Sequence, residues 1–223
     1  MSADQNSPAI PFGLANWGDL RRQEPISARW GFDRGQPVDR YYIENFLHRH
    51  SGDIGGRCVE VMNANYTIRF GQDRVSCADV IDIDPNNDKA NIIGDLLEPG
   101  TLGANSYDCF ILTQTLNYIY DGRTALRNSY AALKPGGTIL VTAACVCRYS
   151  PHPEDFWRLT DRSLERLITD NTDCEDFEVE SHGNLVASMA FLMGLSSAEL
   201  LQEELDHQDS RFPIVVCARL RKK

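Results

Sequence analysis

Acidic side chains recur where short apolar segments of the chain end. They are Glu60, Asp82, Asp84 and Asp95. In an open parallel sheet, ligands bind outside the carboxyl ends of the strands, where connecting loops leave a crevice and helix N-termini face it. One such acid alone is more often a helix cap or part of a solvated turn. Because the four lie at or near the ends of three successive segments, together they favour a ligand with a ribose diol, an adenine amine and a charged ammonium group.

A second group of reactive side chains lies within one short segment, residues 150–158. A reaction at a hydroxyl group needs a general base, and His152 and Asp155 are the candidate catalytic residues for that role. Trp157, whose indole could stack on the apolar face of a sugar, and Arg158 are candidate substrate-binding residues. The alternative is that Trp157 and Arg158 anchor the loop, while the acids cap the helix that follows.

The segments that would position these side chains alternate between strands and helices. The expected strands are 58–62, 79–84, 91–93, 108–112, 138–142, 177–180 and 213–218. Helical patterns occupy 37–51, 121–133 and 160–168, and two more helices lie within 185–205 with a break near Gly194. Alternation of this kind is typical of a parallel sheet with crossover helices. We therefore expect an α/β fold with a mostly parallel, seven-stranded sheet and helices on both faces.

Residues 1–36 differ from the rest of the chain. They are rich in glycine, proline, arginine and aromatic residues and show weak periodicity. We expect an N-terminal extension, residues 1–36, packed on one α/β domain that comprises residues 37–223. A chain of 223 residues buries one sizeable core and has little material for a second. The turn residues Lys134–Gly137 are expected to end a helix whose N-cap is Asp121 and whose last apolar residue is Leu133.

The composition restricts the partners. With 32 acidic and 22 basic residues, the formal net charge is −10, which repels a phosphate backbone, so nucleic acid is not expected as a partner. No segment has the length and apolar character of a membrane span or a signal peptide. The seven cysteines are odd in number and fall mostly in strand-like runs. These features predict a cytoplasmic protein without disulfides or a bound metal.

Several motifs of the chain resemble a known family. They are Trp30–Gly35, Asp39–Glu44, Tyr66–Thr67 with Arg69–Gly71, Tyr107–Asp108 with Leu112–Leu116, Leu133–Gly137, Phe156–Thr160 and Glu203–His207. From Trp30 to Lys223 the chain is similar to class I S-adenosylmethionine-dependent methyltransferases, and in particular to small methyltransferase-like domains found beside bacterial glycosyltransferases. The resemblance implies a Rossmann-like methyltransferase fold and S-adenosylmethionine as cofactor.

The resemblance also implies roles for individual residues. Glu60 would lie near the methionine moiety of the cofactor, directly or through water. Asp82 or Asp84 would bind the ribose hydroxyls, with Asp82 preferred. The Asp95 carboxylate and the Leu96 backbone would bind the adenine. Gln114, after the fourth strand, would lie near the sulfonium and the acceptor.

One departure from the family concerns the loop after the first strand. The family has glycines there, because glycine lets the backbone approach the cofactor and adopts positive φ. This chain has Asn63, Ala64 and Asn65. Asparagine tolerates the left-handed region better than most residues, so Asn63 is a candidate cofactor-binding residue with Asn65 beside it. The Ala64 methyl group would occupy space that the cofactor needs.

Two functions from different classes follow. The first is an S-adenosylmethionine-dependent methyltransferase with a degenerate glycine loop, acting on a small-molecule or carbohydrate acceptor, with O-methylation preferred. The alternative is a non-catalytic domain of the same fold that serves as a binding or scaffold partner in bacterial glycan assembly, beside a glycosyltransferase. A nicotinamide-dependent dehydrogenase is a weaker third reading, because the Gly-x-Gly-x-x-Gly motif is missing after the first strand.

Overall fold

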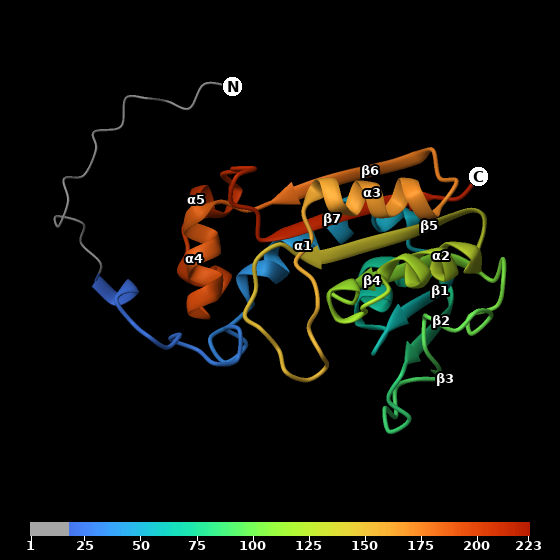
Figure 1. The fold of residues 1–223 in the computed structure, drawn as a ribbon, viewed down its shortest axis with the longest axis horizontal. Helices are drawn as coiled ribbons and strands as arrows, with labels where there is room; N and C mark the ends of the chain where they lie inside the picture. The colour runs from blue at the N-terminus through green and yellow to red at the C-terminus, as the bar shows by residue number, and fades with distance from the viewer. Residues whose placement is uncertain (1–17) are drawn as a thin grey trace.

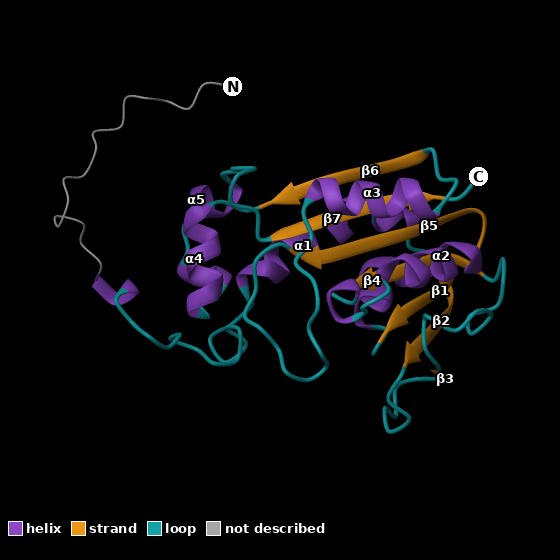
Figure 2. Cartoon of the chain, in the orientation of Figure 1, coloured by secondary structure: helices purple, strands orange, loops and turns teal. Residues whose placement is uncertain are grey.

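A seven-stranded β-sheet forms the centre of the computed structural model, which describes residues 18–223 (Figures 1 and 2). Its strands are β1 (Gly56–Val61), β2 (Val75–Asp82), β3 (Ile92–Ile93), β4 (Tyr107–Thr113), β5 (Leu133–Ala144), β6 (Asp176–His182) and β7 (Val215–Arg221). They lie in the order β3-β2-β1-β4-β5-β7-β6, and β7 runs antiparallel to both of its neighbours. The expected mostly parallel sheet is confirmed.

The direction in which the sheet is built reverses between β1 and β4. The chain adds β2 and β3 outward from β1, and β4 then returns to pair with β1 on its other side. The loops that leave β1 and β4 therefore diverge, and in open α/β sheets this is where ligands bind. Glu60 pairs with Ile111 across these two strands, so the first of the acids stands beside the switch point.

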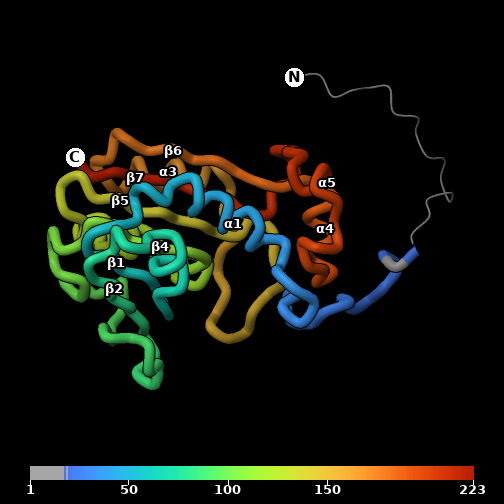
Figure 3. The backbone as a smooth tube through the Cα atoms, turned by 180° about the vertical axis from the view of Figure 1, so that it is seen from behind, coloured from blue at the N-terminus to red at the C-terminus, as the bar shows by residue number. Residues whose placement is uncertain are grey.

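Helices cover both faces of the sheet. On one face lie α2 (Gly122–Ala132) and α3 (Asp161–Asn171), which bury Leu126 and Ile168 against it. On the other face lie α1 (Val38–Arg49), α4 (Leu185–Met193) and α5 (Gln202–Asp206). Figure 3 shows this second face, with α1 in front of the sheet. Alternate strand residues supply the two cores, as the period of two along a strand requires.

Side-chain caps fix several of the helix ends. The Asp121 carboxylate accepts from the Thr124 N–H at the start of α2, and the Asn184 carbonyl oxygen accepts from the Ala187 N–H at the start of α4. Gly194, at φ 74°, ends α4 in the left-handed conformation, where the sequence predicts a break. Leu133 was expected in a helix, and that expectation is wrong. Its backbone is already extended, with ψ 142°, and it begins β5, where it pairs with Tyr107. The expected turn Lys134–Gly137 therefore lies within β5, and the proline at position 135 disfavours helical backbone at the residue before it.

The connections on the β1–β2–β3 side contain no long helix. Between β1 and β2 the chain forms a single π-helical turn, Thr67–Gly71, followed by a 3-10 turn, Gln72–Arg74. Residues 83–91 and 94–106, which connect β2 to β3 and β3 to β4, contain turns and bends within the described chain. The carboxyl ends of these three strands are therefore bordered by loops.

The described part of the N-terminal extension, residues 18–36, contacts the domain near α4. The N–H groups of Ile26 and Ser27 both donate to the carbonyl of Met193, at 2.8 and 3.2 Å. Pro37 forms an isolated antiparallel bridge with Ser196. Residues 1–17 of the expected extension lie outside the described residues.

Candidate ligand site at the strand ends

Glu60 is buried near the end of β1. Its side chain is 2% exposed, and its carboxylate accepts from the backbone N–H groups of Tyr66, at 3.3 Å, and Thr67, at 2.8 Å. Burial raises the pKa of Glu60 to about 7, and the hydrogen bonds from Thr67 and Tyr66 oppose the rise. The acid therefore closes the loop that follows β1 and titrates near neutral pH.

Two non-glycine residues have left-handed backbone conformations at the switch point. Met62, directly after β1, has φ 70°, and Gln114, directly after β4, has φ 50°. Such conformations cost roughly 1–2 kcal/mol per residue, and they cluster at functional sites. The Gln114 N–H donates to the Thr142 carbonyl, at 2.7 Å, which holds the bend against β5.

The loop after β1 therefore differs from the sequence-based expectation. The expectation that Asn63 and Asn65 supply the left-handed geometry is wrong, because Met62 supplies it. Instead, the Asn63 side-chain oxygen accepts from the Asn65 N–H, at 3.0 Å, in a local turn. The backbone strain that glycine would relieve thus lies at position 62, two residues before Ala64.

Asp82 and Asp84 have different surroundings. Asp82 is the last residue of β2, and its carboxylate accepts from the Asn87 amide, at 2.6 Å, and from the Asp84 N–H, at 3.0 Å. The same Asn87 amide donates to the Met62 carbonyl, at 2.8 Å, so it joins the ends of β1 and β2. Asp84 is exposed and accepts from Asn86 within its own turn. Of the two acids, Asp82 is the one at the strand end.

Asp95 and Leu96 follow β3. The Asp95 carboxylate accepts from the Leu97 N–H, at 2.9 Å, and the Leu96 carbonyl accepts from the Asn128 amide of α2, at 2.8 Å. The Leu96 side chain is buried in the core. Both residues are thereby held in fixed positions between β3 and α2.

Large apolar side chains are exposed at the same edge of the sheet. Met62 after β1 is 61% exposed, Ile83 after β2 is 69% exposed, and Ile93 in β3 is 50% exposed. Exposed apolar side chains that gather beside polar groups are typical of a surface that a ligand covers. The edge thus combines carboxylates with apolar surface.

The segment 148–158 lies beyond the carboxyl end of β5, beside the described N-terminal residues (Figure 1). Asp155 forms a two-point ion pair with Arg158, in which Nη2 lies 2.7 Å from Oδ2, and it also accepts from the Ser150 N–H, at 3.1 Å. The Asp155 side chain is 1% exposed. The hydrogen bond from Arg158 lowers the pKa of Asp155. A buried carboxylate with these partners is a poor proton acceptor, so the contacts favour the anchoring interpretation for Asp155 and Arg158.

Trp157 and His152 occupy the surface of the same segment. The indole N–H of Trp157 donates to the carbonyls of Ile119, at 3.1 Å, and Tyr120, at 3.2 Å. The ring is 41% exposed and stacks on Tyr120. The His152 imidazole is exposed, and no hydrogen bond to its ring nitrogens forms within residues 18–223. Trp157 is thus both an anchor and part of an exposed aromatic surface.

Sequence reasoning missed Asn117, which holds this segment in place. Its amide donates to the carbonyls of Trp157, at 2.7 Å, and Ala144, at 3.3 Å, and its oxygen accepts from the Ala144 N–H, at 3.1 Å. Its backbone carbonyl accepts from the N–H groups of Phe156 and Trp157. The side chain is 2% exposed. One feature of the sequence could have identified Asn117. It is a polar residue within an otherwise apolar stretch that follows a predicted strand.

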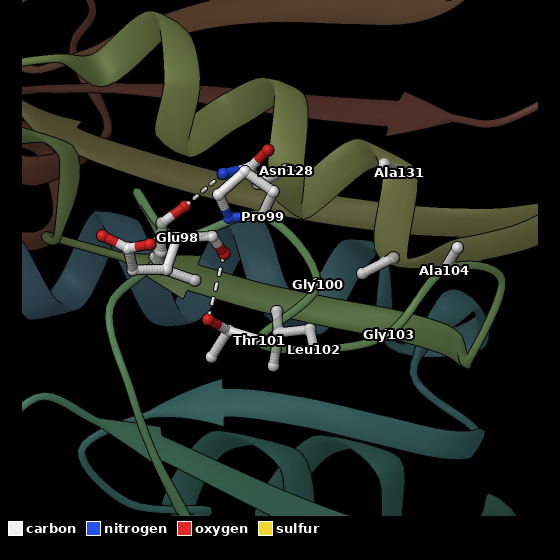
Figure 4. Close-up of a pocket in the computed structure, with 11 residues that line it drawn as sticks. Glu98, Pro99, Gly100, Thr101, Leu102, Gly103, Ala104, Asn128 and Ala131 are labelled. Atoms are coloured by element: carbon white, nitrogen blue, oxygen red, sulfur yellow. Dashed lines mark hydrogen bonds between the residues drawn. The ribbon is translucent and has the colours of Figure 1, made fainter.

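A cavity of about 150 Å³ lies between the loop that follows β3 and helix α2 (Figure 4). It is lined by the 96–104 loop and by Asn128, Ala131 and Ala132 of α2. Cavities for small-molecule ligands usually measure about 300–1,000 Å³. This one is too small for a nucleoside-containing cofactor, and among its lining residues Glu98 alone has an ionisable side chain.

Residues 18–223 contain neither a cluster of metal ligands nor a membrane-spanning helix. No three histidine, cysteine or acidic side chains of this part of the chain gather as ligands for a metal ion. No helix in the same residues combines the length and apolar character needed to cross a membrane.

Comparisons with known proteins identify relatives of the fold. Residues 55–141, from the start of β1 into β5, match a family model described as a methyltransferase domain. The sequence matches no curated protein. A SAM-dependent methyltransferase from Archaeoglobus fulgidus superposes with a TM-score of 0.57 at 12% identity, over 82% of this chain and 94% of that one.

Two other solved structures show how widely this fold is used. An S-adenosylmethionine-dependent methyltransferase from Mesorhizobium loti matches with a TM-score of 0.56 at 14% identity, over 86% of this chain and 100% of that one. The [4+2]-cyclase SpnF matches with a TM-score of 0.54 at 15% identity, over 85% of this chain and 84% of that one. The chain therefore has the Rossmann-like methyltransferase fold, and its chemistry has to be argued from its own residues.

Proposed function

We propose that this protein transfers a methyl group from S-adenosylmethionine to a hydroxyl group of a small-molecule or carbohydrate acceptor. The observation that carries the proposal is the edge formed by the ends of β1, β2 and β3, where Asp82 and Asp95 lie beside exposed Met62, Ile83 and Ile93. A carboxylate accepts hydrogen bonds from a ribose diol or an adenine amine, and apolar side chains cover the flat face of a purine. The residues present therefore fit an adenosyl group.

Individual residues have proposed roles toward that group. Asp82 binds the ribose hydroxyls, and Asp95 with the Leu96 backbone binds the adenine. Glu60 and the Asn63 amide lie on the methionine side, and Gln114 borders the position between cofactor and acceptor. When bound, the cofactor supplies a methyl group on a sulfonium that is already a good leaving group, so the protein contributes mainly placement.

Calorimetric titration with S-adenosylhomocysteine tests the cofactor assignment. The wild type is expected to bind, and Asp82→Ala is expected to weaken binding by roughly tenfold or more, because hydrogen bonds to a charged group contribute about 1.5–3 kcal/mol. Asp84→Ala is the matched control, since Asp84 bonds within its own turn, and it should change the affinity less than about threefold. Absence of both heat and thermal shift in the wild type would contradict the proposal.

The acceptor side is proposed from an exposed aromatic cluster. Tyr120 is 70% exposed, and Phe156 and Trp157 are each 41% exposed. Their ring centroids lie 5.5 Å (Tyr120–Phe156) and 5.8 Å (Tyr120–Trp157) apart. Aromatic rings present apolar surface to the C–H face of a sugar while nearby polar groups bind its hydroxyls. This supports a carbohydrate or other ring-containing acceptor, with Trp157 in contact with it.

His152 is the proposed general base for the acceptor hydroxyl, because Asp155 is occupied by Arg158. Once an acceptor is identified, His152→Ala should lower the rate of methyl transfer by about 10²–10⁴-fold. The melting temperature should stay within about 1 °C of the wild type, since the imidazole is exposed and loss of surface contacts changes stability little. His207→Ala, which changes an exposed histidine beyond α5, is the control. Full activity in His152→Ala would exclude the assignment.

A second candidate function is a non-catalytic binding or scaffold domain, as a partner of a glycosyltransferase in glycan assembly. The observation that favours it is the loop after β1, which contains no glycine from position 62 to position 70 and has methionine in the left-handed conformation. The same titration separates the two candidates, because a scaffold that has lost the cofactor gives no binding heat.

A further inference from the structure

A groove lined by cationic and hydrogen-bonding side chains lies towards the amino ends of β1 and β2. Ser51 precedes the amino end of β1, and Arg74 directly precedes β2. Because β1 and β2 run parallel, this groove faces away from the strand ends that carry Asp82. The groove, called here the arginine groove, is lined by His48, Ser51, Arg69, Phe70, Gln72 and Arg74.

The size of the arginine groove suits a small organic molecule. It measures about 470 Å³, whereas the cavity beside α2 measures about 150 Å³. Cavities for small-molecule ligands usually measure about 300–1,000 Å³. The arginine groove therefore has room for a ligand larger than a single inorganic ion.

The charge of the arginine groove is opposite to that of the whole chain. The formal net charge is −10, whereas none of the six lining residues is acidic and two are arginines. Arg69 pairs with Glu44 of α1, at 2.8 Å. The partners of Arg74 in the described chain are backbone carbonyls rather than carboxylates. The charge of Arg74 therefore has no anionic partner within residues 18–223, and it favours an anion in the groove.

Both guanidinium groups are held in place by some of their nitrogens and keep others available. Nε and Nη2 of Arg74 donate to backbone carbonyls, among them that of Ser51, at 2.8 Å. Nη1 of Arg74 forms no hydrogen bond within residues 18–223. Arg69 uses Nη1 toward Glu44, so its Nε and Nη2 likewise have no partner in that part of the chain. Donors that are fixed before a ligand arrives lose little conformational freedom when it binds.

Three uncharged donors line the same groove. They are the His48 imidazole at the end of α1, the Ser51 hydroxyl and the Gln72 amide, and none of these groups forms a hydrogen bond within residues 18–223. Gln72 also has φ 51°, a left-handed conformation of the kind that gathers at functional sites. Donors from α1, from the turn Ser51–Asp53 and from the turn Gln72–Arg74 thus converge without an acceptor.

We propose that the arginine groove binds a small organic molecule through a phosphate group. Phosphate oxygens accept parallel hydrogen bonds from a guanidinium and further bonds from hydroxyl and amide donors. Arg69 and Arg74 bind the phosphate, and the rest of the groove holds the organic portion, either a sugar or a nucleoside. A nucleic-acid polymer is excluded as the ligand by the negative charge of the whole chain. The proposal does not depend on methyl transfer at the strand ends.

Calorimetric titration of the full chain with three probes tests the site. The probes are inorganic phosphate, glucose 1-phosphate and cytidine 5′-monophosphate, and at least one ester should bind about fivefold or more tighter than inorganic phosphate. The ester that binds more tightly distinguishes a sugar phosphate from a nucleotide. Arg69→Gln should weaken binding of that ester by roughly tenfold or more, because hydrogen bonds to charged groups are strong. Its melting temperature should stay close to that of the wild type, since the Arg69 side chain is 59% exposed.

Arg162→Gln is the matched control. Arg162 is an exposed arginine on α3 that pairs with Glu165, at 3.0 Å, so the substitution removes the same charge outside the groove. It should leave the affinity for the ester within about twofold of the wild type. Equal weakening in Arg69→Gln and Arg162→Gln would show a general attraction to positive charge and would overturn the site.

Three other results also overturn the proposal. They are no binding heat with either ester, inorganic phosphate bound as tightly as the esters, and unchanged affinity in Arg69→Gln. If Arg69→Gln fails to fold, Gln72→Gly replaces it, because glycine adopts the left-handed conformation without strain. Loss of the Gln72 amide should weaken binding of the ester by about threefold or more, and unchanged affinity in that variant would reject the site.

Discussion

Glu60→Gln is expected to remove a pH-dependent loss of stability that the wild type shows between about pH 4.5 and about pH 7. Burial raises the pKa of Glu60 from 4.5 to about 7 in the folded protein. Between these values the folded chain holds a proton that the unfolded chain has released. Stability conferred by this proton is therefore complete at low pH and declines as the pH rises through the folded pKa. For a carboxyl group that is 2% exposed, the shift corresponds to about 3 kcal/mol.

Urea unfolding at pH 5 and pH 8 measures this effect. The difference between the two unfolding free energies should be about 3 kcal/mol smaller in Glu60→Gln than in the wild type, because glutamine does not titrate. Glu175→Gln is the matched control, since the Glu175 side chain is 80% exposed, and it should retain the wild-type difference. An unchanged pH dependence in Glu60→Gln would show that the carboxyl group is ionised throughout this range.

Asn117→Ala is expected to destabilise the protein by about 3 kcal/mol and to release the segment 148–158. The substitution removes the acceptor of the buried Ala144 N–H and the donor to the Trp157 carbonyl. An unsatisfied buried group costs about 1–3 kcal/mol, and the lost packing of the amide adds to it. Since Asn117 joins the ends of β4 and β5 to Trp157, the aromatic cluster should lose its fixed position.

Two measurements separate local release from general unfolding. Urea unfolding gives the loss of stability, and limited trypsin digestion follows cleavage after Arg148 and Arg158 under conditions where the rest of the chain stays folded. Asn128→Ala is the control, because the Asn128 amide donates one hydrogen bond from a partly exposed position in α2. It should cost about 1 kcal/mol and leave the segment resistant. Wild-type resistance in Asn117→Ala would mean that other contacts hold the segment.

The architecture follows from patterns that act over short distances. Apolar runs bounded by turns indicated all seven strands, and Asp121, Thr160 and Gly194 marked helix ends at which a cap or a left-handed residue is found. Strands and helix ends depend on side chains that lie within a few residues of them. The spacing of residues in the sequence is therefore enough to predict their positions.

Other features depend on which distant segments meet, and spacing could not reveal them. The role of Asn117 requires that residues 144 and 157 come beside it. The left-handed conformation occurs at Met62 although Asn63 follows it, because the chain bends where β1 ends and where the Asn87 amide, 25 residues away, donates to the Met62 carbonyl. Asp155 is a case of a different kind, because its partners Arg158 and Ser150 are close in sequence, but residues 155–158 form no regular element whose spacing could have predicted the ion pair.

The position of β7 determines the order in which the sheet can be completed. β6 pairs with β7 on one side, and β7 in turn pairs with β5, so β7 lies between two strands that precede it in the chain. Until the seventh strand has been synthesised, β6 has no neighbour in the sheet and β5 presents an open edge. Insertion of β7 between them is then the last step of assembly, and it depends on contacts between residues far apart in sequence, which form slowly. During synthesis on the ribosome, the half of the sheet from β3 to β5 can form first, with its unpaired edge exposed to other nascent chains until β7 arrives.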